Sequence, residues 1–155
     1  RFDGPLDMRM DQQANGIVRG RAECGGDALT ASLILNEWGA SEIAGVLWRN
    51  GQEKKSRHLA RAIVAARPLT STSQLAAVLQ KAAPGPPKEV TKRLARVFQA
   101  LRIEVNQEMH ELETVLADAA SLVRPGGRIA VLSYHSLEDG RVKRLLRSGS
   151  TGGDT

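Results

Sequence analysis

The chain has 155 residues, enough for one domain with a hydrophobic core or for parts of two. Hydrophobic residues make up 41% and charged residues 25%, and no apolar run approaches the roughly 20 residues that span a bilayer, so we expect neither a disordered nor a membrane-embedded chain. The 22 Lys and Arg residues against 17 Asp and Glu residues leave a net charge of +5, which favours a polyanionic partner.

The first 26 residues show no helical or strand period. Asp3-Gly4-Pro5 is a turn signal, and residues 1–11 have the composition of a solvated loop. Residues 12–26 are rich in glycine and polar side chains, which predicts a surface insertion. Cys24 is the only cysteine, so it excludes an internal disulfide and fits a reducing compartment. The chain begins at Arg1 without a Met or a targeting pattern, so we expect the natural N-terminus to be missing.

A helical unit is predicted between residues 27 and 83. Asp27 or Thr30 can cap a first short helix, and Ser41 with Glu42 can start a second that Gly51 ends. A third helix over 56–66 carries a basic edge, and the Ser and Thr residues at 70–73 can cap a fourth. The basic edge consists of Arg57, His58, Arg61 and Arg67.

The longest periodic segment covers residues 88–122. Its apolar residues recur at spacings of three and four, which indicates an amphipathic helix. Because the span is about three times the mean helix length, it predicts either one long helix or two helices with a bend.

A turn and a short buried strand are predicted after this segment. Arg124-Pro125-Gly126-Gly127 is typical of a turn, and residues 128–132 form an apolar run suited to a buried strand. A short basic helix over Gly140–Arg147 and a flexible tail over residues 148–155 complete the chain.

Polar side chains follow the predicted strand, where ligands bind in open α/β sheets. His135, Glu138 and Asp139 lie within five residues and could move protons or accept hydrogen bonds from an amine. The alternative is structural: Ser136 caps the next helix, and His135 only satisfies a backbone group. We expect no metal site, because the three His residues are scattered without ligand spacing. There is also no nucleophile elbow and no dinucleotide fingerprint.

Three stretches together resemble the RsmH/MraW family. They are Asp3 to Asp11 (DGPLDMRMD), Phe98 to Asn106 (FQALRIEVN) and Pro125 to Asp139 (PGGRIAVLSYHSLED). The resemblance implies an S-adenosyl-L-methionine-dependent methyltransferase that modifies the N4 amine of a cytidine in small-subunit ribosomal RNA. Such an enzyme would act in ribosome biogenesis. Its partner would be the small ribosomal subunit or the RNA of that subunit.

The resemblance also implies an architecture and a location. The fold class would be α/β, with part of a Rossmann-like methyltransferase domain interrupted by an all-helical domain. Residues 1–26 would hold a cofactor and active-site loop plus an insertion, 27–102 a helical substrate-recognition domain, and 103–147 the C-terminal part of the methyltransferase domain. A bacterial cytoplasm or the interior of an organelle fits this class, whereas the oligomeric state is not indicated.

Site residues follow from the same resemblance. Catalytic roles would fall on His135, Glu138, Asp139 and Asp7, and minor cofactor contacts on Asp3 and Met8. RNA contacts would come from residues that are basic or can hydrogen-bond to phosphate, namely Arg9, Arg61, Lys88, Lys92, Arg96, Arg102, Asn106 and Arg144.

The family's glycine-rich cofactor loop would precede Arg1. We therefore expect the 155-residue chain alone to bind S-adenosyl-L-methionine poorly, which calorimetry can test. The alternative reading is a non-catalytic RNA-binding or ribosome-assembly module, in which the helical block binds RNA and the predicted strand region is scaffold.

Overall fold

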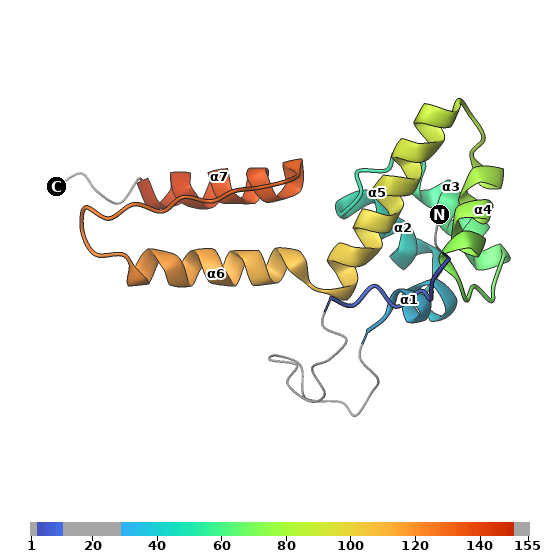
Figure 1. Ribbon diagram of the computed structural model, residues 1–155, viewed down its shortest axis with the longest axis horizontal. Coiled ribbons are helices and arrows are strands. Elements are labelled where there is room, and N and C mark those ends of the chain that lie inside the picture. The colour runs from blue at the N-terminus through green and yellow to red at the C-terminus, as the bar shows by residue number, and fades with distance from the viewer. Residues whose placement is uncertain (1–2, 11–28, 151–155) are drawn as a thin grey trace. The chain divides into compact units, whose positions relative to one another are not determined.

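The computed structural model describes residues 3–10 and 29–150, and within them it contains seven α-helices (Figure 1). The predictions made for Asp11, Cys24, Asp27, the insertion at 12–26 and the end of the tail at 151–155 lie outside the described residues. The chain divides after Asn106 into two compact units, which we call the helical unit and the C-terminal unit.

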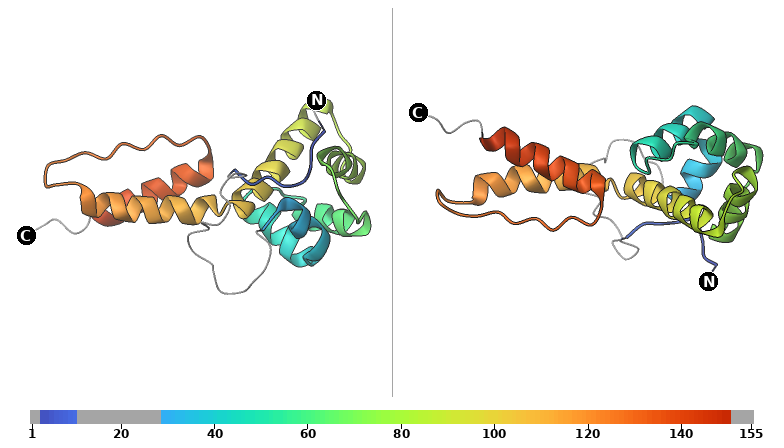
Figure 2. Two further views of the ribbon diagram at one scale, coloured as in Figure 1. Left: turned by 60° about the horizontal axis from the view of Figure 1, so that its bottom comes forward. Right: turned by 90° about the horizontal axis from the view of Figure 1, so that it is seen from above.

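The helical unit contains five helices. They are α1 (Ala31–Glu37), α2 (Ala40–Arg49), α3 (Ser56–Ala65), α4 (Thr72–Ala82) and α5 (Pro87–Val105). Helix α2 packs against both α3 and α5, and α3 also packs against α4, so the helices enclose one core (Figure 2). The largest apolar side chains that are fully enclosed are Leu6, Ile34, Leu35, Ile43, Leu47, Leu59, Ile63, Leu75, Leu79, Leu101 and Ile103.

The helix starts follow the expected capping chemistry. The Thr30 hydroxyl accepts a hydrogen bond from the Leu33 amide, with 3.2 Å between Oγ1 and N, and Ser71 caps α4 in the same way. At α2 the first residue is Ala40, and the Glu42 carboxylate accepts the Gly39 amide at 2.7 Å. These contacts confirm the predicted short helices, with Thr30 as the cap of the first.

Gly51 is required where α2 approaches α5. A Cβ atom at this position would lie 2.8 Å from the backbone oxygens of both Leu47 and Arg96. Since backbone atoms cannot move aside, Gly51→Ala is expected to lower the free energy of unfolding by about 1–3 kcal/mol. Gly85→Ala is the control, because a Cβ there meets nothing within 4 Å. Equal unfolding midpoints for the two variants in urea would contradict this account.

The long periodic segment forms two helices. Helix α5 ends at Val105, and Gln107 has a left-handed backbone with φ of 51° before α6 (Glu108–Leu122) begins. The sequence predicted either one long helix or two helices with a bend, and the structure shows the second arrangement. The break also separates the two units.

The C-terminal unit consists of α6, an extended return segment and α7 (Ser136–Ser150). The predicted turn is confirmed, because the Gly127 amide donates to the Arg124 carbonyl at 2.9 Å and Gly126 has φ of 81°. The segment then runs back so that α6 and α7 lie side by side in the same direction (Figures 1 and 2). Helix α7 begins four residues before the predicted Gly140 and extends to Ser150, three residues into the predicted tail.

The predicted buried strand at 128–132 is wrong for the described structure. These residues form no strand, and Leu132 is 78% exposed. The described residues contain no sheet, only an isolated bridge between Pro5 and Ser71, so the α/β class is not observed in them. A strand needs a neighbour to satisfy its backbone groups, and none of the described segments lies alongside residues 128–132 as a strand.

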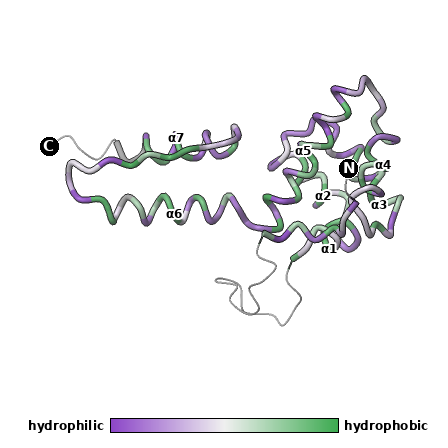
Figure 3. Tube along the Cα trace, in the orientation of Figure 1, coloured by the Kyte–Doolittle hydropathy of each residue, from purple (hydrophilic) through white to green (hydrophobic). Residues whose placement is uncertain are grey.

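Apolar side chains are exposed across the C-terminal unit. The return segment is coloured as hydrophobic over part of its length in Figure 3 although it contacts no sheet. The exposed residues are Val115, Leu122, Val131, Leu132, Tyr134 and Leu146. None of the helices in the described part of the chain is long and apolar enough to cross a membrane.

Candidate active site

The loop Asp3–Met10 is held firmly on the helical unit, although its sequence has no regular period. Leu6 is only 2% exposed and belongs to the core. The carbonyls of Leu6 and Asp7 accept the amides of Ser32 and Ala31 at 2.6 and 3.1 Å. The loop is therefore fixed at the start of α1, where helix amides lack partners within the helix.

Asp7 and Arg9 form a two-point ion pair within this loop. The guanidinium donates from Nε to Oδ1 at 2.5 Å and from Nη2 to Oδ2 at 2.8 Å. This hydrogen bonding by Arg9 lowers the pKa of Asp7, so the carboxylate stays ionised at neutral pH. Both side chains keep contact with solvent, at 24% exposed for Asp7 and 39% for Arg9.

Asn106 clamps the far end of the same loop. Its Oδ1 accepts the Met10 amide at 2.8 Å, and its Nδ2 donates to the carbonyls of Met8 and Arg102 at 2.9 and 2.8 Å. Met8 has φ of 61°, a left-handed conformation that is uncommon for a residue with a side chain and is often found at functional sites. We predicted RNA contact for Asn106, and the structure shows its amide engaged with the loop and with α5.

Asp3 lies at the N-terminus of α4. Its carboxylate accepts hydrogen bonds from the Ser73 amide at 3.0 Å and from the hydroxyls of Ser73 and Thr72 at 2.8 and 3.2 Å. Met8 packs partly buried against the core. These two residues, for which we predicted cofactor contacts, thus already have protein partners, and their contact with a cofactor stays a prediction.

Asp3 should make the stability of the helical unit depend on pH. Hydrogen bonds from Ser73, led by its backbone amide, lower the pKa of Asp3 below the usual 3.8. A lowered pKa stabilises the fold above the unfolded-state value, and this contribution disappears as pH falls through the folded-state value. Asp3→Ala is therefore expected to reduce the melting temperature at pH 7 more than near pH 2.5. A pH-independent difference in thermal unfolding would contradict this assignment.

In the C-terminal unit, His135 and Glu138 form a compact pair at the start of α7. The Glu138 amide donates to His135 Nδ1 at 3.3 Å, and Glu138 Oε2 accepts the Tyr134 amide at 2.9 Å. Because Nδ1 accepts, the neutral ring carries its proton on Nε2. That buried atom lies 3.2 Å from Glu138 Oε1 but is not aligned for a hydrogen bond. His135 therefore caps the helix and satisfies a backbone amide, as the structural alternative expected, whereas the cap expected from Ser136 is not observed.

Two other carboxylates lie near this pair. Asp139 accepts from Lys143 at 2.8 Å one helical turn along α7, an exposed pair that contributes little to stability. Glu108, His135 and Glu138 each offer one potential ligand atom within 4.8 Å of the others. Two oxygens and one nitrogen could hold a divalent cation, although carboxylates also gather without one. The expectation of no metal site stays a prediction.

The predicted RNA-contacting cations belong to several elements of the two units. Arg9 is paired with Asp7, and Arg96 donates to the buried Glu53 carboxylate at 2.6 and 3.0 Å. Lys92 lies 3.9 Å from Glu89. Of the remaining cations, Lys88 and Arg102 lie on α5, Arg61 on α3 and Arg144 on α7. Thus several side chains that we predicted to contact RNA bind other residues of the chain.

Two features of the helical unit were missed or misassigned from sequence. Glu53 is only 2% exposed, and no sequence signal distinguished it from a surface carboxylate. Arg67 was assigned to the basic edge, but it donates to the carbonyls of Leu35, at 2.7 Å, and Trp38 at the end of α1. Because these carbonyls lie 32 and 29 residues earlier in the chain, no local sequence signal indicated this role.

Comparison with known proteins defines the class of the chain. The model of the MraW methylase family matches residues 1–154. A protein of Novosphingobium aromaticivorans named ribosomal RNA small subunit methyltransferase H is 49% identical over 156 residues, covering 96% of this chain and 42% of that protein. A protein of the same name from Acidobacterium capsulatum is 44% identical, and the match covers 97% of this chain and 46% of that protein. Another, from Chlorobium phaeovibrioides, is 46% identical, and the match covers 96% of this chain and 42% of that protein.

The chain belongs to the MraW methylase family, as the resemblance predicted. It spans less than half the length of these curated relatives, because 42–46% of each is covered. The family assignment therefore applies to the chain itself, and the activity of a whole protein is a separate question.

Proposed function

We propose that the complete protein transfers a methyl group from S-adenosyl-L-methionine to the N4 amine of a cytidine in small-subunit ribosomal RNA. The observation that carries the proposal is the family match over residues 1–154, together with relatives named ribosomal RNA small subunit methyltransferase H. The bacterial relatives support the cytoplasm as its location. The cofactor site is assigned to the part of the relatives that this chain does not span.

Methyl transfer to an exocyclic amine requires hydrogen-bond acceptors, and the two units contain carboxylates that can serve as acceptors. The amine is a weak nucleophile because its lone pair is delocalised into the base. It needs acceptors for its N–H groups as positive charge develops during methyl transfer. Asp7 is an ionised carboxylate on a fixed loop, and Glu138, beside His135, is a second carboxylate that can accept a hydrogen bond. We assign these residues to orientation of the amine, with Asp139 as a further candidate.

A Rossmann-like sheet belongs to the same proposal. Helices α6 and α7 run in one direction with an extended segment returning between them, as in repeated helix–strand units of α/β proteins (Figure 1). The exposed apolar residues Val131 and Leu132 would be buried if other strands of the complete protein paired with this segment. The helical unit then takes the role of an inserted substrate-recognition domain.

The test is nucleoside mass spectrometry of small-subunit ribosomal RNA from cells with and without the complete gene. Loss of N4-methylcytidine, restored by the wild-type gene, is the expected result. Persistence of the nucleoside in a strain without another such enzyme would reject catalysis and favour the RNA-binding module.

A further inference from the structure

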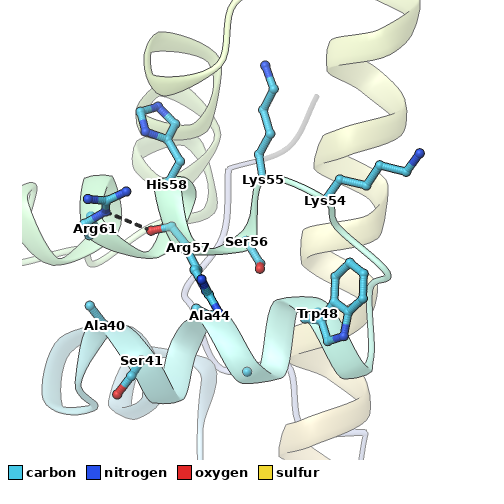
Figure 4. A pocket seen from close by; sticks show the side chains of 11 residues that line it. Ala40, Ser41, Ala44, Trp48, Lys54, Lys55, Ser56, Arg57, His58 and Arg61 are labelled. Atoms are coloured by element: carbon cyan, nitrogen blue, oxygen red, sulfur yellow. Dashed lines mark hydrogen bonds between the residues drawn. The ribbon is translucent and has the colours of Figure 1, made fainter.

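An open hollow lies between α2 and the start of α3 in the helical unit (Figure 4). Its volume of about 1030 Å³ is at the upper end of the ~300–1,000 Å³ found for small-ligand pockets. None of the loop residues Asp3–Met10 lines it. The lining combines small residues, one aromatic ring and basic side chains: Ala40, Ser41, Ala44, Gly45, Trp48, Lys54, Lys55, Ser56, Arg57, His58 and Arg61.

The hollow carries positive charge that no carboxylate neutralises within the described part of the chain. Four cations line it, and none of them forms a salt bridge there; they are Lys54, Lys55, Arg57 and Arg61. Arg61 donates to the Arg57 carbonyl at 3.3 Å, which orients its side chain without removing its charge. The nearby Glu53 is buried and bonded to Arg96. The charge is therefore available to an anionic partner.

Trp48 provides an aromatic surface beside these cations. Its side chain is 58% exposed at the end of α2, whereas Ala44 beneath the hollow is buried (Figure 4). An exposed indole next to several cations is suited to a base that stacks while its phosphates contact Lys or Arg. An acidic protein would use the charges but would not require the flat ring, and a duplex would not present an unstacked base.

We infer that this hollow binds a single-stranded stretch of RNA, with a base stacked on Trp48 and the backbone phosphates held by Arg57, Arg61, Lys54 and Lys55. The inference rests on the proposed function only for the identity of the natural RNA. It gives the helical unit a nucleotide-binding surface distinct from the Asp3–Met10 loop. His58, whose Nε2 lies 2.7 Å from the Ala82 carbonyl, borders this surface and is anchored to the end of α4.

The experiment measures binding of the complete protein to a fluorescein-labelled 12-nucleotide oligouridine by anisotropy at several salt concentrations. Trp48→Ala is expected to weaken binding about 5- to 100-fold, and Trp48→Phe to restore most of the loss. Arg57→Gln with Arg61→Gln is expected to reduce the slope of log Kd against log salt by about 1.4, because each single-strand phosphate contact contributes about 0.7. Lys81→Gln with Arg147→Gln, which removes the same charge from exposed sites elsewhere, should leave the slope nearly unchanged.

A second readout reports on the ring itself. This readout uses the 155-residue chain, whose helical unit has its own core. The chain contains two Trp residues, so Trp38→Phe leaves Trp48 as its only indole. A base that stacks on Trp48 should then quench the fluorescence of this indole when the oligonucleotide is added. The control is the same titration of a Trp48→Phe variant, which retains Trp38. Circular dichroism melts show whether each variant is folded.

Unchanged affinity and slope in folded Trp48 and Arg57/Arg61 variants would overturn the inference. Binding of polyglutamate with the same residue dependence would overturn it in favour of an acidic protein partner. These outcomes are separate from the proposed function. Loss of N4-methylcytidine in the gene deletion with normal oligonucleotide binding by the variants rejects the hollow alone. Persistence of the nucleoside with impaired binding rejects the methyltransferase alone.

Discussion

Asp7→Asn in the complete protein is expected to lower the rate of methyl transfer to small-subunit ribosomal RNA by about 100-fold, because removing one group that stabilises developing charge typically costs about 10²–10³ in rate. The substitution removes the negative charge and keeps the shape of the side chain. Its effect on folding should be small, since the pair with Arg9 is partly exposed and such pairs contribute about 0–1 kcal/mol. Transfer of labelled methyl groups and thermal unfolding measure the two effects.

The matched control for Asp7→Asn is Glu89→Gln. Glu89 is an exposed carboxylate paired with Lys92 three residues later, and it lies on α5 away from the loop. Its replacement should leave methyl transfer unchanged. Arg9→Gln distinguishes a second possibility, that Asp7 acts only by fixing Arg9. If Arg9→Gln and Asp7→Asn reduced the rate equally, the carboxylate would have no separate role; a rate within threefold of wild type for Asp7→Asn would reject its role altogether.

Arg96→Ala is expected to lower the free energy of unfolding by about 2–4 kcal/mol, because it leaves the Glu53 carboxylate buried without its cation. Glu53 is 2% exposed, and Arg96 supplies two hydrogen bonds at 2.6 and 3.0 Å. The estimate lies below the values for fully buried pairs because the Arg96 side chain is 39% exposed. Urea unfolding measures the loss. The RNA contact that the resemblance implied for Arg96 stays a separate prediction.

The control for Arg96→Ala removes both charges. A double variant with Glu53→Met and Arg96→Met should recover most of the stability, because replacing both members of a buried pair with apolar residues is often neutral. Lys88→Ala, which removes an exposed cation from the same helix, should change stability by less than about 0.5 kcal/mol. A loss for Arg96→Ala as small as that for Lys88→Ala would show that Glu53 does not depend on this cation.

The helices of the helical unit were predictable because their signals are local. Apolar spacing and caps such as Thr30 and Ser71 act within one or two turns, and the structure places the helices where these signals indicated. The partners of polar side chains were not predictable in this way. Asn106 reaches Met8 and Met10 across about a hundred residues of sequence, and Arg96 reaches Glu53 across 43. Nothing near Arg96 in the sequence distinguishes an internal salt bridge from an exposed phosphate contact.

The sequence by itself determined the family of the chain, its helical unit and the segments that carry the candidate chemistry, because motifs and amphipathic periods are properties of neighbouring residues. Only the tertiary structure decided that the Asp3 carboxylate meets the first turn of α4 and that Arg67 meets the end of α1. It likewise decided that Trp48 lies in one hollow with four cations that form no salt bridge among the described residues. It also decided that residues 128–132 form no strand here. The physical reason is common to these cases: a cap, an ion pair or a sheet is completed by its partner, and the position of that partner depends on the fold.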